Sequence, residues 1–383
     1  MNRMEQDLQG WIPRLVAEWR RMAGIRGAGL PTARLTRNET DQVGTALLRL
    51  QRGLTGSRTL IGGGYMNDPG SLGAYLLYYW PVSYLQTRYA LVESGMHPRK
   101  LLDLGSGPGA ATLACIDAGA VTALAADRSR DALGVAGRLA RAGGVKIETT
   151  SWNGESGAPL PPGSYDCIIL GHVLNELWVE RSDRIERRLA LLERISGHLG
   201  PAGRILILEP ALLATSRELL HLRDRLMERG FQILAPCLFP GPCPAFAAGS
   251  DSTCHSEWAW ELPPLVRDLA RAARLDRHSC KTTYLVISRS TPSGAGLAGV
   301  FRVVSDPMLN QAGRTRYMIC GLEGRFSLSA KPGEAGSAER SFFSLKRGDL
   351  IRVAHTETRG SGRGVTPETV LEVLKPGSKG KVK

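Results

Sequence analysis

Three glycines at alternate positions, Gly105, Gly107 and Gly109, follow an apolar run that contains Asp103. Such a run predicts a buried parallel strand, and the glycines predict a tight turn into the start of a helix. Glycine suits this turn because a side chain would block a ligand that lies against the backbone. The segment therefore predicts a ligand-binding turn at the carboxyl end of a strand.

The spacing of these glycines bears on the class of ligand. Dinucleotide-binding folds place the third glycine of a related turn one residue later, so an NAD site is the alternative. The spacing here resembles motif I of the class I S-adenosylmethionine (SAM) methyltransferases. This resemblance implies SAM contacts from the turn and its flanking residues, namely Asp103, Gly105, Ser106, Gly107 and Gly109.

Polar residues after the next three predicted strands complete the expected SAM site. Asp127 ends the second strand, about twenty residues after the turn, where a carboxylate accepts hydrogen bonds from ribose hydroxyls; a helix cap is the alternative. Trp152 and Asn153 follow the third strand, and the resemblance implies that they contact the adenine. His172 follows the fourth strand as a further cofactor contact. His172 and Glu176 are also the candidates for a catalytic base, with a structural role as the alternative.

A doubly wound sheet is needed to position these residues. Residues 98–290 alternate strand-like and helix-like segments, which predicts an α/β, Rossmann-like fold of the class I SAM methyltransferase type. The strands are expected at residues 101–104, 121–126, 146–149, 165–170, 204–208 and 283–287. The fourth strand is not followed by an Asn/Asp-Pro-Pro-aromatic tetrad, so no signature of amine methylation accompanies the fold.

Residues 1–97 predict a helical region ahead of this sheet. Apolar residues recur at helical spacing between Leu8 and Trp19, and further helices are expected at residues 40–51 and 71–91. Ser71 is the expected N-cap of the last helix, which Pro81 should kink or divide. We expect the aromatic cluster of this helix to pack on the following domain rather than to contact a ligand. The cluster consists of Tyr75, Tyr78, Tyr79, Trp80 and Tyr84.

Cysteines gather in a loop rich in proline and glycine, at residues 236–256. Three occur within eighteen residues: Cys237, Cys243 and Cys254. Proline stiffens the loop, so less entropy is lost when thiolates converge on a metal. A [4Fe–4S] cluster needs a fourth cysteine, for which Cys280 and Cys320 are candidates. A zinc site that adds His255 or Cys280 is the alternative.

Composition sets the class of protein and of partner. A hydrophobic content of 43% and a charged content of 22% are typical of a folded, soluble chain. The net charge of +13 favours a polyanionic partner such as RNA. Without an apolar run of the ~20 residues that a membrane helix requires, and without a signal-peptide pattern, we expect a cytoplasmic monomer that does not bind membranes.

The C-terminal part has a different composition. Residues 291–300 are rich in Ser, Gly and Pro and predict a linker. Short alternating runs in residues 301–374 predict a small β-rich domain similar to an OB-fold, a fold that commonly binds nucleic acid. Residues 375–383 predict a basic tail that touches RNA loosely. The strands are expected at residues 301–304, 316–320, 325–328, 350–353 and 370–374.

Taken together, these motifs resemble one family, the methyltransferase-like proteins that assist assembly of the small ribosomal subunit in bacteria and mitochondria. The resemblance covers roughly residues 70–330. It is carried by residues 81–84, 103–109, 172–177, 284–289 and 320–324 and by the Cys237-x5-Cys243-Pro244…Cys254-His255 pattern. The chain departs from the family in having Cys280 and a shortened polar stretch after Cys243.

The resemblance implies a SAM-type fold, a structural [4Fe–4S] cluster and binding to small-subunit ribosomal RNA. It also implies that Cys320, rather than Cys280, is the fourth cluster ligand. The expected function is therefore assembly of the small ribosomal subunit. The alternatives are an active SAM-dependent ribosomal RNA methyltransferase, and a small-molecule methyltransferase with a zinc site.

Overall fold

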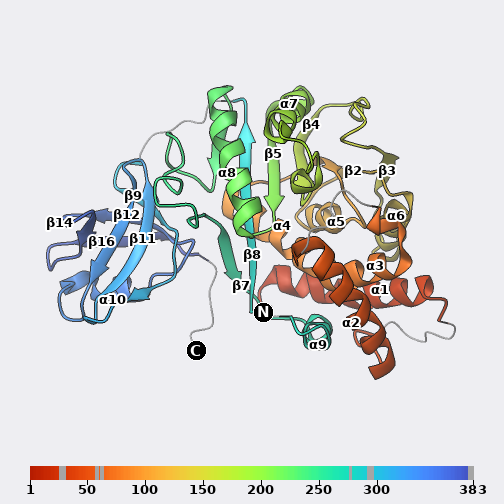
Figure 1. Cartoon of the computed structure of the whole chain (residues 1–383), viewed down its shortest axis with the longest axis horizontal. Coiled ribbons are helices and arrows are strands. Elements are labelled where there is room, and N and C mark those ends of the chain that lie inside the picture. The colour runs from red at the N-terminus through yellow and green to blue at the C-terminus, as the bar shows by residue number, and fades with distance from the viewer. Residues whose placement is uncertain (26–31, 57–59, 61–63, 276–277, 291–296, 378–383) are drawn as a thin grey trace.

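The computed structural model describes residues 1–383 except 26–31, 57–59, 61–63, 276–277, 291–296 and 378–383 (Figure 1). Helices of the N-terminal region and a first sheet make up one part of the molecule, and a second sheet carries the C-terminal part. Much of the predicted linker and most of the predicted tail lie outside the described residues. Within the described residues, no helix has the length and apolar character needed to cross a membrane.

The first sheet has the strand order of a class I methyltransferase. Its strands are β1 (Lys100–Leu104), β2 (Thr122–Asp127), β3 (Glu148–Ser151), β4 (Tyr165–Gly171), β5 (Leu199–Glu209), β6 (Gln232–Ala235), β7 (Ser256–Ala259) and β8 (Ser279–Ser288). They lie in the order β3-β2-β1-β4-β5-β8-β6, and β7 pairs with β8. Neighbours from β3 to β5 are parallel, whereas β8 is antiparallel to β5 and β6. A dinucleotide-binding sheet instead has the parallel order 3-2-1-4-5-6. The predicted SAM-type fold is therefore confirmed.

Alternate residues of the central strands enter two separate cores. Leu101 of β1 and Ile169 of β4 pack on one face, and Leu102 and Ile168 pack on the other. Successive side chains of a strand point to opposite faces, so one apolar run fills both layers. The first face is covered by α1 (Arg3–Met22), α2 (Arg37–Gln51), α4 (Trp80–Ser94), α5 (Ala110–Asp117), α6 (Arg130–Ala142) and α9 (Pro264–Ala272). The second face is covered by α7 (Arg184–Ser196) and α8 (Leu213–Glu228).

The helix that contains Pro81 is divided, as predicted. It consists of α3 (Pro69–Ala74), a π-helix η3 (Tyr75–Tyr79) and α4, with Pro81 in the first turn of α4. The expected cap was wrong: Asp68 is the N-cap and accepts a hydrogen bond from the Ser71 N–H at 2.8 Å. The helix starts earlier than its apolar pattern indicates because Pro69 occupies its first turn.

Packing fixes α4 against the glycine turn. The indole Nε1 of Trp80 donates to the Pro108 carbonyl at 3.1 Å, and the Tyr84 hydroxyl donates to Asp117 Oδ2 at 2.5 Å. Trp11 of α1 donates to the same carboxylate oxygen at 2.7 Å. The N-terminal helices are therefore bound to α5, the helix that follows the glycine turn.

The second sheet contains the strands predicted for the C-terminal part. They are β9 (Val300–Val303), β10 (Met308–Leu309), β11 (Thr315–Gly321), β12 (Gly324–Ala330), β13 (Leu350–Ala354), β14 (Glu357–Arg359), β15 (Gly362–Gly364) and β16 (Val370–Lys375). Their order is β14-β15-β12-β11-β9-β13-β16, with β10 paired to β11. The core of this second sheet contains Phe301 of β9 and Tyr317 of β11. Phe342 of a short helix, α10 (Glu339–Phe343), packs into the same core. The likeness to an OB-fold stays a prediction.

Candidate functional site

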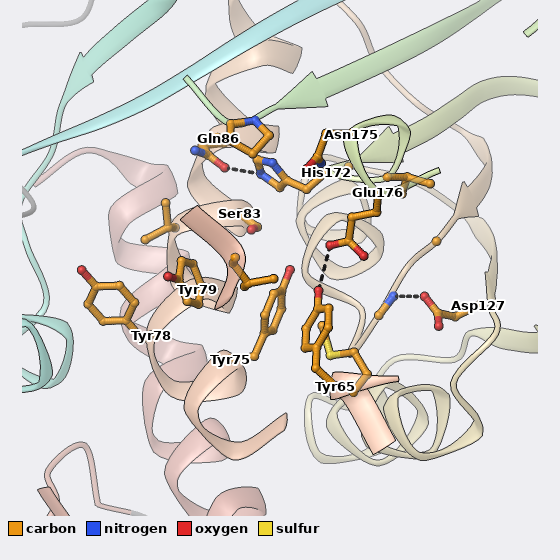
Figure 2. Close-up of a pocket in the computed structure, with 18 of the residues that line it drawn as sticks. Tyr65, Tyr75, Tyr78, Tyr79, Ser83, Gln86, Asp127, His172, Asn175 and Glu176 are labelled. Atoms are coloured by element: carbon orange, nitrogen blue, oxygen red, sulfur yellow. Dashed lines mark hydrogen bonds between the residues drawn. The ribbon is translucent and has the colours of Figure 1, made fainter. Parts of the chain in front are cut away.

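A cavity of about 890 Å³ opens at the carboxyl ends of β1, β2, β3 and β4 (Figure 2). Ligands bind at this edge in open α/β sheets. Seven of the predicted site residues lie on its wall: Gly105, Gly107, Asp127, Trp152, Asn153, His172 and Glu176. Three others lie away from the wall: Asp103, Ser106 and Gly109.

Two glycines of the turn have different roles. Gly105 has φ +73°, and a Cβ there would lie 2.3 Å from Val173 Cγ2, so no larger residue fits the packing. Gly107 has φ +52°, and the nearest atom to a Cβ there is Met66 Cε at 3.7 Å. Gly107 therefore keeps the cavity open, whereas Gly105 allows close packing beneath it.

Asp127 connects the end of β2 to the glycine turn. Its carboxylate accepts hydrogen bonds from the Gly107 and Ser129 backbone N–H groups, both at 2.8 Å. Burial raises the pKa of this carboxyl group. The cap alternative was wrong, because Ser129 is the N-cap of α6. Asp127 thus supports the turn while facing the cavity.

Asp103 lies behind the turn. It is 1% exposed and accepts a hydrogen bond from the Thr112 hydroxyl at 2.6 Å, which ties β1 to α5. Burial raises the pKa of Asp103 to about 7. Oδ1 of Asp103 has no hydrogen-bond partner among the described residues. In its observed contacts, Asp103 therefore supports the packing of β1 on α5 and does not reach the cavity.

Trp152 and Asn153 follow β3 on the cavity wall. The Trp152 backbone N–H donates to the Asp127 carbonyl at 3.0 Å, so the two predicted ligand contacts are held together. The Trp152 ring is buried, and its Nε1 has no partner among the described residues. Asn153 Oδ1 accepts a hydrogen bond from the Glu155 N–H at 3.0 Å.

His172 and Glu176 each contact the N-terminal helical region. His172 Nε2 lies 2.7 Å from Gln86 Oε1, and Gln86 Nε2 donates to the Lys281 carbonyl at 2.6 Å. Because the Gln86 amide nitrogen donates elsewhere, its oxygen accepts from His172, which places the proton on Nε2. The Tyr65 hydroxyl donates to Glu176 Oε1 at 3.0 Å (Figure 2).

The N-terminal wall of the cavity was missed at the level of sequence. Three tyrosines of the aromatic cluster line the cavity, whereas Trp80 and Tyr84 pack on the domain as expected. The packing prediction was right for Tyr78, Trp80 and Tyr84, which are fully buried, and missed that the half-buried Tyr75 and Tyr79 also face the cavity. The tyrosines on the wall are Tyr75, Tyr78 and Tyr79.

Glu209, at the end of β5, is a buried acid that sequence reasoning did not single out. It is 2% exposed, and Oε1 accepts a hydrogen bond from the Asn175 N–H at 3.3 Å. Burial raises the pKa of Glu209 to about 8, although the nearby Arg188 guanidinium opposes this shift. Its signal was local: an acid directly after an apolar strand run.

Glu209→Gln is expected to flatten the pH dependence of stability. A glutamate in an unfolded chain has a pKa of about 4.3, so the unfolded state loses this proton at a lower pH than the folded state does. The free energy of unfolding therefore falls as the pH rises from about 4.3 towards 8. Glutamine holds no titrating proton, so the slope should decrease by up to about 1.4 kcal/mol per pH unit. Urea unfolding of both proteins between about pH 5 and pH 8 measures the slope of the free energy of unfolding against pH. Equal slopes in both proteins would contradict the buried acid. Glu39→Gln is the control, since a hydrogen bond from Arg20 lowers the pKa of Glu39 to about 2 and its titration lies outside this pH range.

The structure gathers four of the seven cysteines. The thiol of Cys320 on β11 is close enough to those of Cys254, Cys237 and Cys243 for each to raise its pKa. Burial is the larger cause, and it raises the pKa of Cys237 to about 11 and that of Cys320 to about 12. The first three cysteines come from the predicted loop, and the fourth comes from the second sheet.

The alternative ligands lie elsewhere. Cys280 is fully buried, with Sγ 3.9 Å from the Val82 carbonyl oxygen. His255 lies beside Glu257, with Nε2 3.7 Å from its carboxylate. Among the residues that the structure describes, no group of three or more His, Cys, Asp or Glu side chains is placed to hold a metal ion. The four thiols are therefore neighbours, but in the described part of the chain they are not arranged to bind a single metal ion.

Arginine and aspartate side chains hold the cysteine loop. Arg223 of α8 is 1% exposed and donates to the carbonyls of Phe239 and Gly241. Asp224 pairs with Arg223 at 2.6 Å and accepts a hydrogen bond from the Cys243 N–H at 3.0 Å. The loop conformation is thus fixed by an ion pair on the neighbouring helix.

The second sheet holds the same loop from the other side. Arg302 of β9 donates to the Pro236 carbonyl at 2.9 Å and pairs with Glu93 of α4 at 2.6 Å. Arg325 of β12 donates to the Ser252 hydroxyl at 3.0 Å. The loop that carries Cys237, Cys243 and Cys254 therefore lies between the two sheets (Figure 1).

Comparison with known families bears directly on this arrangement. The sequence model of the family described as "mitochondrial small ribosomal subunit Rsm22" matches residues 73–352, which span the first sheet and much of the second. The chain belongs to the Rsm22 family. The resemblance to methyltransferase-like small-subunit proteins is confirmed in this form. A search of curated proteins gave no match.

Solved structures similar to this Rsm22 family member include several methyltransferases. A ribosomal protein L11 methylase from Lactobacillus delbrueckii subsp. bulgaricus is 19% identical, with 55% of this chain and 78% of that chain covered and a TM-score of 0.33. A methyltransferase from Pyrococcus furiosus is 13% identical, with coverage of 54% and 83% and a TM-score of 0.36. The plantazolicin methyltransferase BpumL, solved with SAH, is 12% identical, with coverage of 66% and 99% and a TM-score of 0.36. The strand order, and not these scores, is the basis for the fold.

Proposed function

We propose that this Rsm22 family member is an assembly factor of the small ribosomal subunit that binds SAM, a [4Fe–4S] cluster and small-subunit ribosomal RNA. The observation that supports the function most strongly is the family match across residues 73–352. The matched residues include most of those that line the cavity and all four of the gathered cysteines. The net charge of +13 supports a polyanionic partner.

The cavity offers what SAM requires. Gly107 leaves room against the backbone, Asp127 supplies a carboxylate for the ribose hydroxyls, and Trp152 supplies a buried aromatic face. Asn153 adds a side-chain amide on the same wall. SAM bound here would supply an electrophilic methyl group, and the chain's own residues would bind and orient it.

The cysteine junction suits a group larger than one ion. Four thiols are the donor set of a [4Fe–4S] cluster, and a cluster spreads its ligands more widely than a single metal ion does. Thiolate ligands leave the centre with net negative charge. Burial raises the pKa of these cysteines, and four arginines oppose that rise, so positive charge lies beside the thiols. The arginines are Arg223, Arg302, Arg325 and Arg347. In this proposal the cluster joins the two sheets and is structural.

Binding of ribosomal RNA is the decisive test of the proposed function. We expect purified, anaerobically prepared protein to bind a small-subunit ribosomal RNA fragment in a filter-binding assay. Raising the salt from about 50 to 200 mM should weaken binding at least about tenfold, because lysines and arginines displace counterions from the phosphates.

A large-subunit ribosomal RNA fragment of equal length is the matched control and should bind more weakly. Equal affinity for both fragments would leave only non-specific charge attraction, and the assembly function would then be wrong. Failure to bind either fragment at low salt would have the same consequence.

A further inference from the structure

The cavity has a second half, away from the glycine turn, that a departure from α-helical geometry creates. The π-helix η3 interrupts an otherwise continuous helical segment between α3 and α4. Single π-turns within α-helices are rare and occur frequently at functional sites. Here the turn brings Tyr75 and Tyr79 to the cavity wall, whereas Tyr78 between them and the next residue, Trp80, lie in the core.

The tyrosines form a continuous aromatic surface. The ring centroids of Tyr65 and Tyr75 are 6.5 Å apart, and those of Tyr75 and Tyr79 are 5.6 Å apart with a tilt of 30°. Tyr78 is fully buried and packs edge to face against Tyr79 at 5.2 Å, so it supports this surface from the core and does not extend it. Tyr75 and Tyr79 are only half-buried, so parts of both side chains remain accessible.

Hydrogen-bonding groups come toward the same space from other elements. Gln86 lies one helical turn beyond Ser83 on α4, and His172 and Glu176 follow β4. Figure 2 shows Tyr75 and Tyr79 below this space, the Glu176 carboxylate beside it and the His172–Gln86 pair above it. An aromatic wall faced by amide, imidazole and carboxylate groups suits a planar, polar ring.

The size of the cavity leaves room for such a ring beside SAM. Sites for one drug-sized ligand have volumes of about 300–1,000 Å³, and this cavity of about 890 Å³ lies near the upper limit. SAM at Gly107, Asp127 and Trp152 would occupy the half formed by the strand ends. The half formed by η3 would then stay available.

We propose that the tyrosine-lined half of the cavity binds a single nucleobase, extruded from single-stranded RNA, next to SAM. This inference rests on the proposed SAM site and RNA partner, and it adds the place where one base enters the protein. The tyrosine rings stack on the base, and the polar groups opposite hydrogen-bond to its edge.

Saturation-transfer difference NMR with AMP, CMP, GMP and UMP, in the presence of saturating SAH, tests the inference. We expect at least one mononucleotide to receive saturation mainly on its base protons. Tyr79→Ala should weaken its apparent affinity at least about fivefold, because one stacking surface is lost. Tyr79→Phe, which keeps the ring, should bind like the wild type.

Two further measurements keep the outcome interpretable. If Tyr79→Ala fails to fold, Tyr79→Leu removes the ring while keeping apolar volume, and the affinity of SAH verifies the other half of the cavity. The absence of base saturation with all four nucleotides, or equal affinities in wild type and Tyr79→Leu, would overturn the inference. Loss of ribosomal RNA binding with mononucleotide binding intact would instead overturn only the proposed function.

Discussion

Cys320→Ser is expected to lose the iron and acid-labile sulfide that the wild-type chain should bind when prepared without oxygen. Cys320 lies on β11 of the second sheet, whereas the other three thiols come from the loop between β6 and β7. Removing this ligand should therefore release the cluster and weaken the contact between the two sheets, which Arg302 and Arg325 would still hold in part. We expect the free energy of unfolding to fall by at least about 3 kcal/mol. Iron and sulfide analysis, together with anaerobic thermal unfolding, measures both effects.

Cys280→Ser is the matched control for this substitution. Its thiol is fully buried beside Val82 and lies apart from the four gathered cysteines. The Cys280→Ser protein should retain iron and sulfide, and its free energy of unfolding should fall only slightly because a hydroxyl group is buried. Iron loss in Cys280→Ser with retention in Cys320→Ser would show that the ligand set is wrong. One zinc per wild-type chain and no sulfide would support the zinc alternative.

Gly107→Arg is expected to abolish binding of SAM and of its product SAH. Among the described residues, a Cβ at Gly107 would come within 4 Å of Met66 Cε alone, at 3.7 Å. Gly107 lies on the cavity wall, so a long side chain would extend into the cavity rather than into the core. We expect affinity for SAH to fall at least about a hundredfold in calorimetric titration. The cost in stability should be limited to about 1–2 kcal/mol, from a side chain at φ +52°.

Gly107→Ala separates the effect of the side chain from the effect of the backbone. It carries the same unfavourable φ, but its methyl group fits the 3.7 Å space, so it should bind SAH within about tenfold of the wild type. If Gly107→Arg and Gly107→Ala bind SAH equally well, the cofactor does not lie against this turn. Binding of ribosomal RNA by Gly107→Arg then shows whether assembly requires SAM.

Many strands of both sheets could be predicted because the sequence patterns that indicate them are local. Apolar strand runs ended by polar residues located β1, β2, β4 and β5, and alternating runs located the main strands of the second sheet. The glycine turn was equally local, since the positive φ at Gly105 and Gly107 favours glycine wherever the turn lies. The grouping of Cys237, Cys243 and Cys254 followed from their place in one stiff loop.

Contacts between distant segments decided the rest. Nothing near Tyr75 or Tyr79 in the sequence shows that a π-turn points them into the cavity while Trp80 packs on Pro108. Asp103 matches the motif, but burial against Thr112 keeps it off the cavity wall.

The fourth cysteine shows the same division most clearly. Cys280 and Cys320 are both cysteines that follow the loop, and the residues alone left both as candidates; only the resemblance favoured Cys320. The fold buries Cys280 beside α4 and brings β11, with Cys320, to the loop. Local sequence thus determined which residue types and turns were available to this protein. Tertiary packing determined which of them meet, because it sets the distances between segments far apart in the chain.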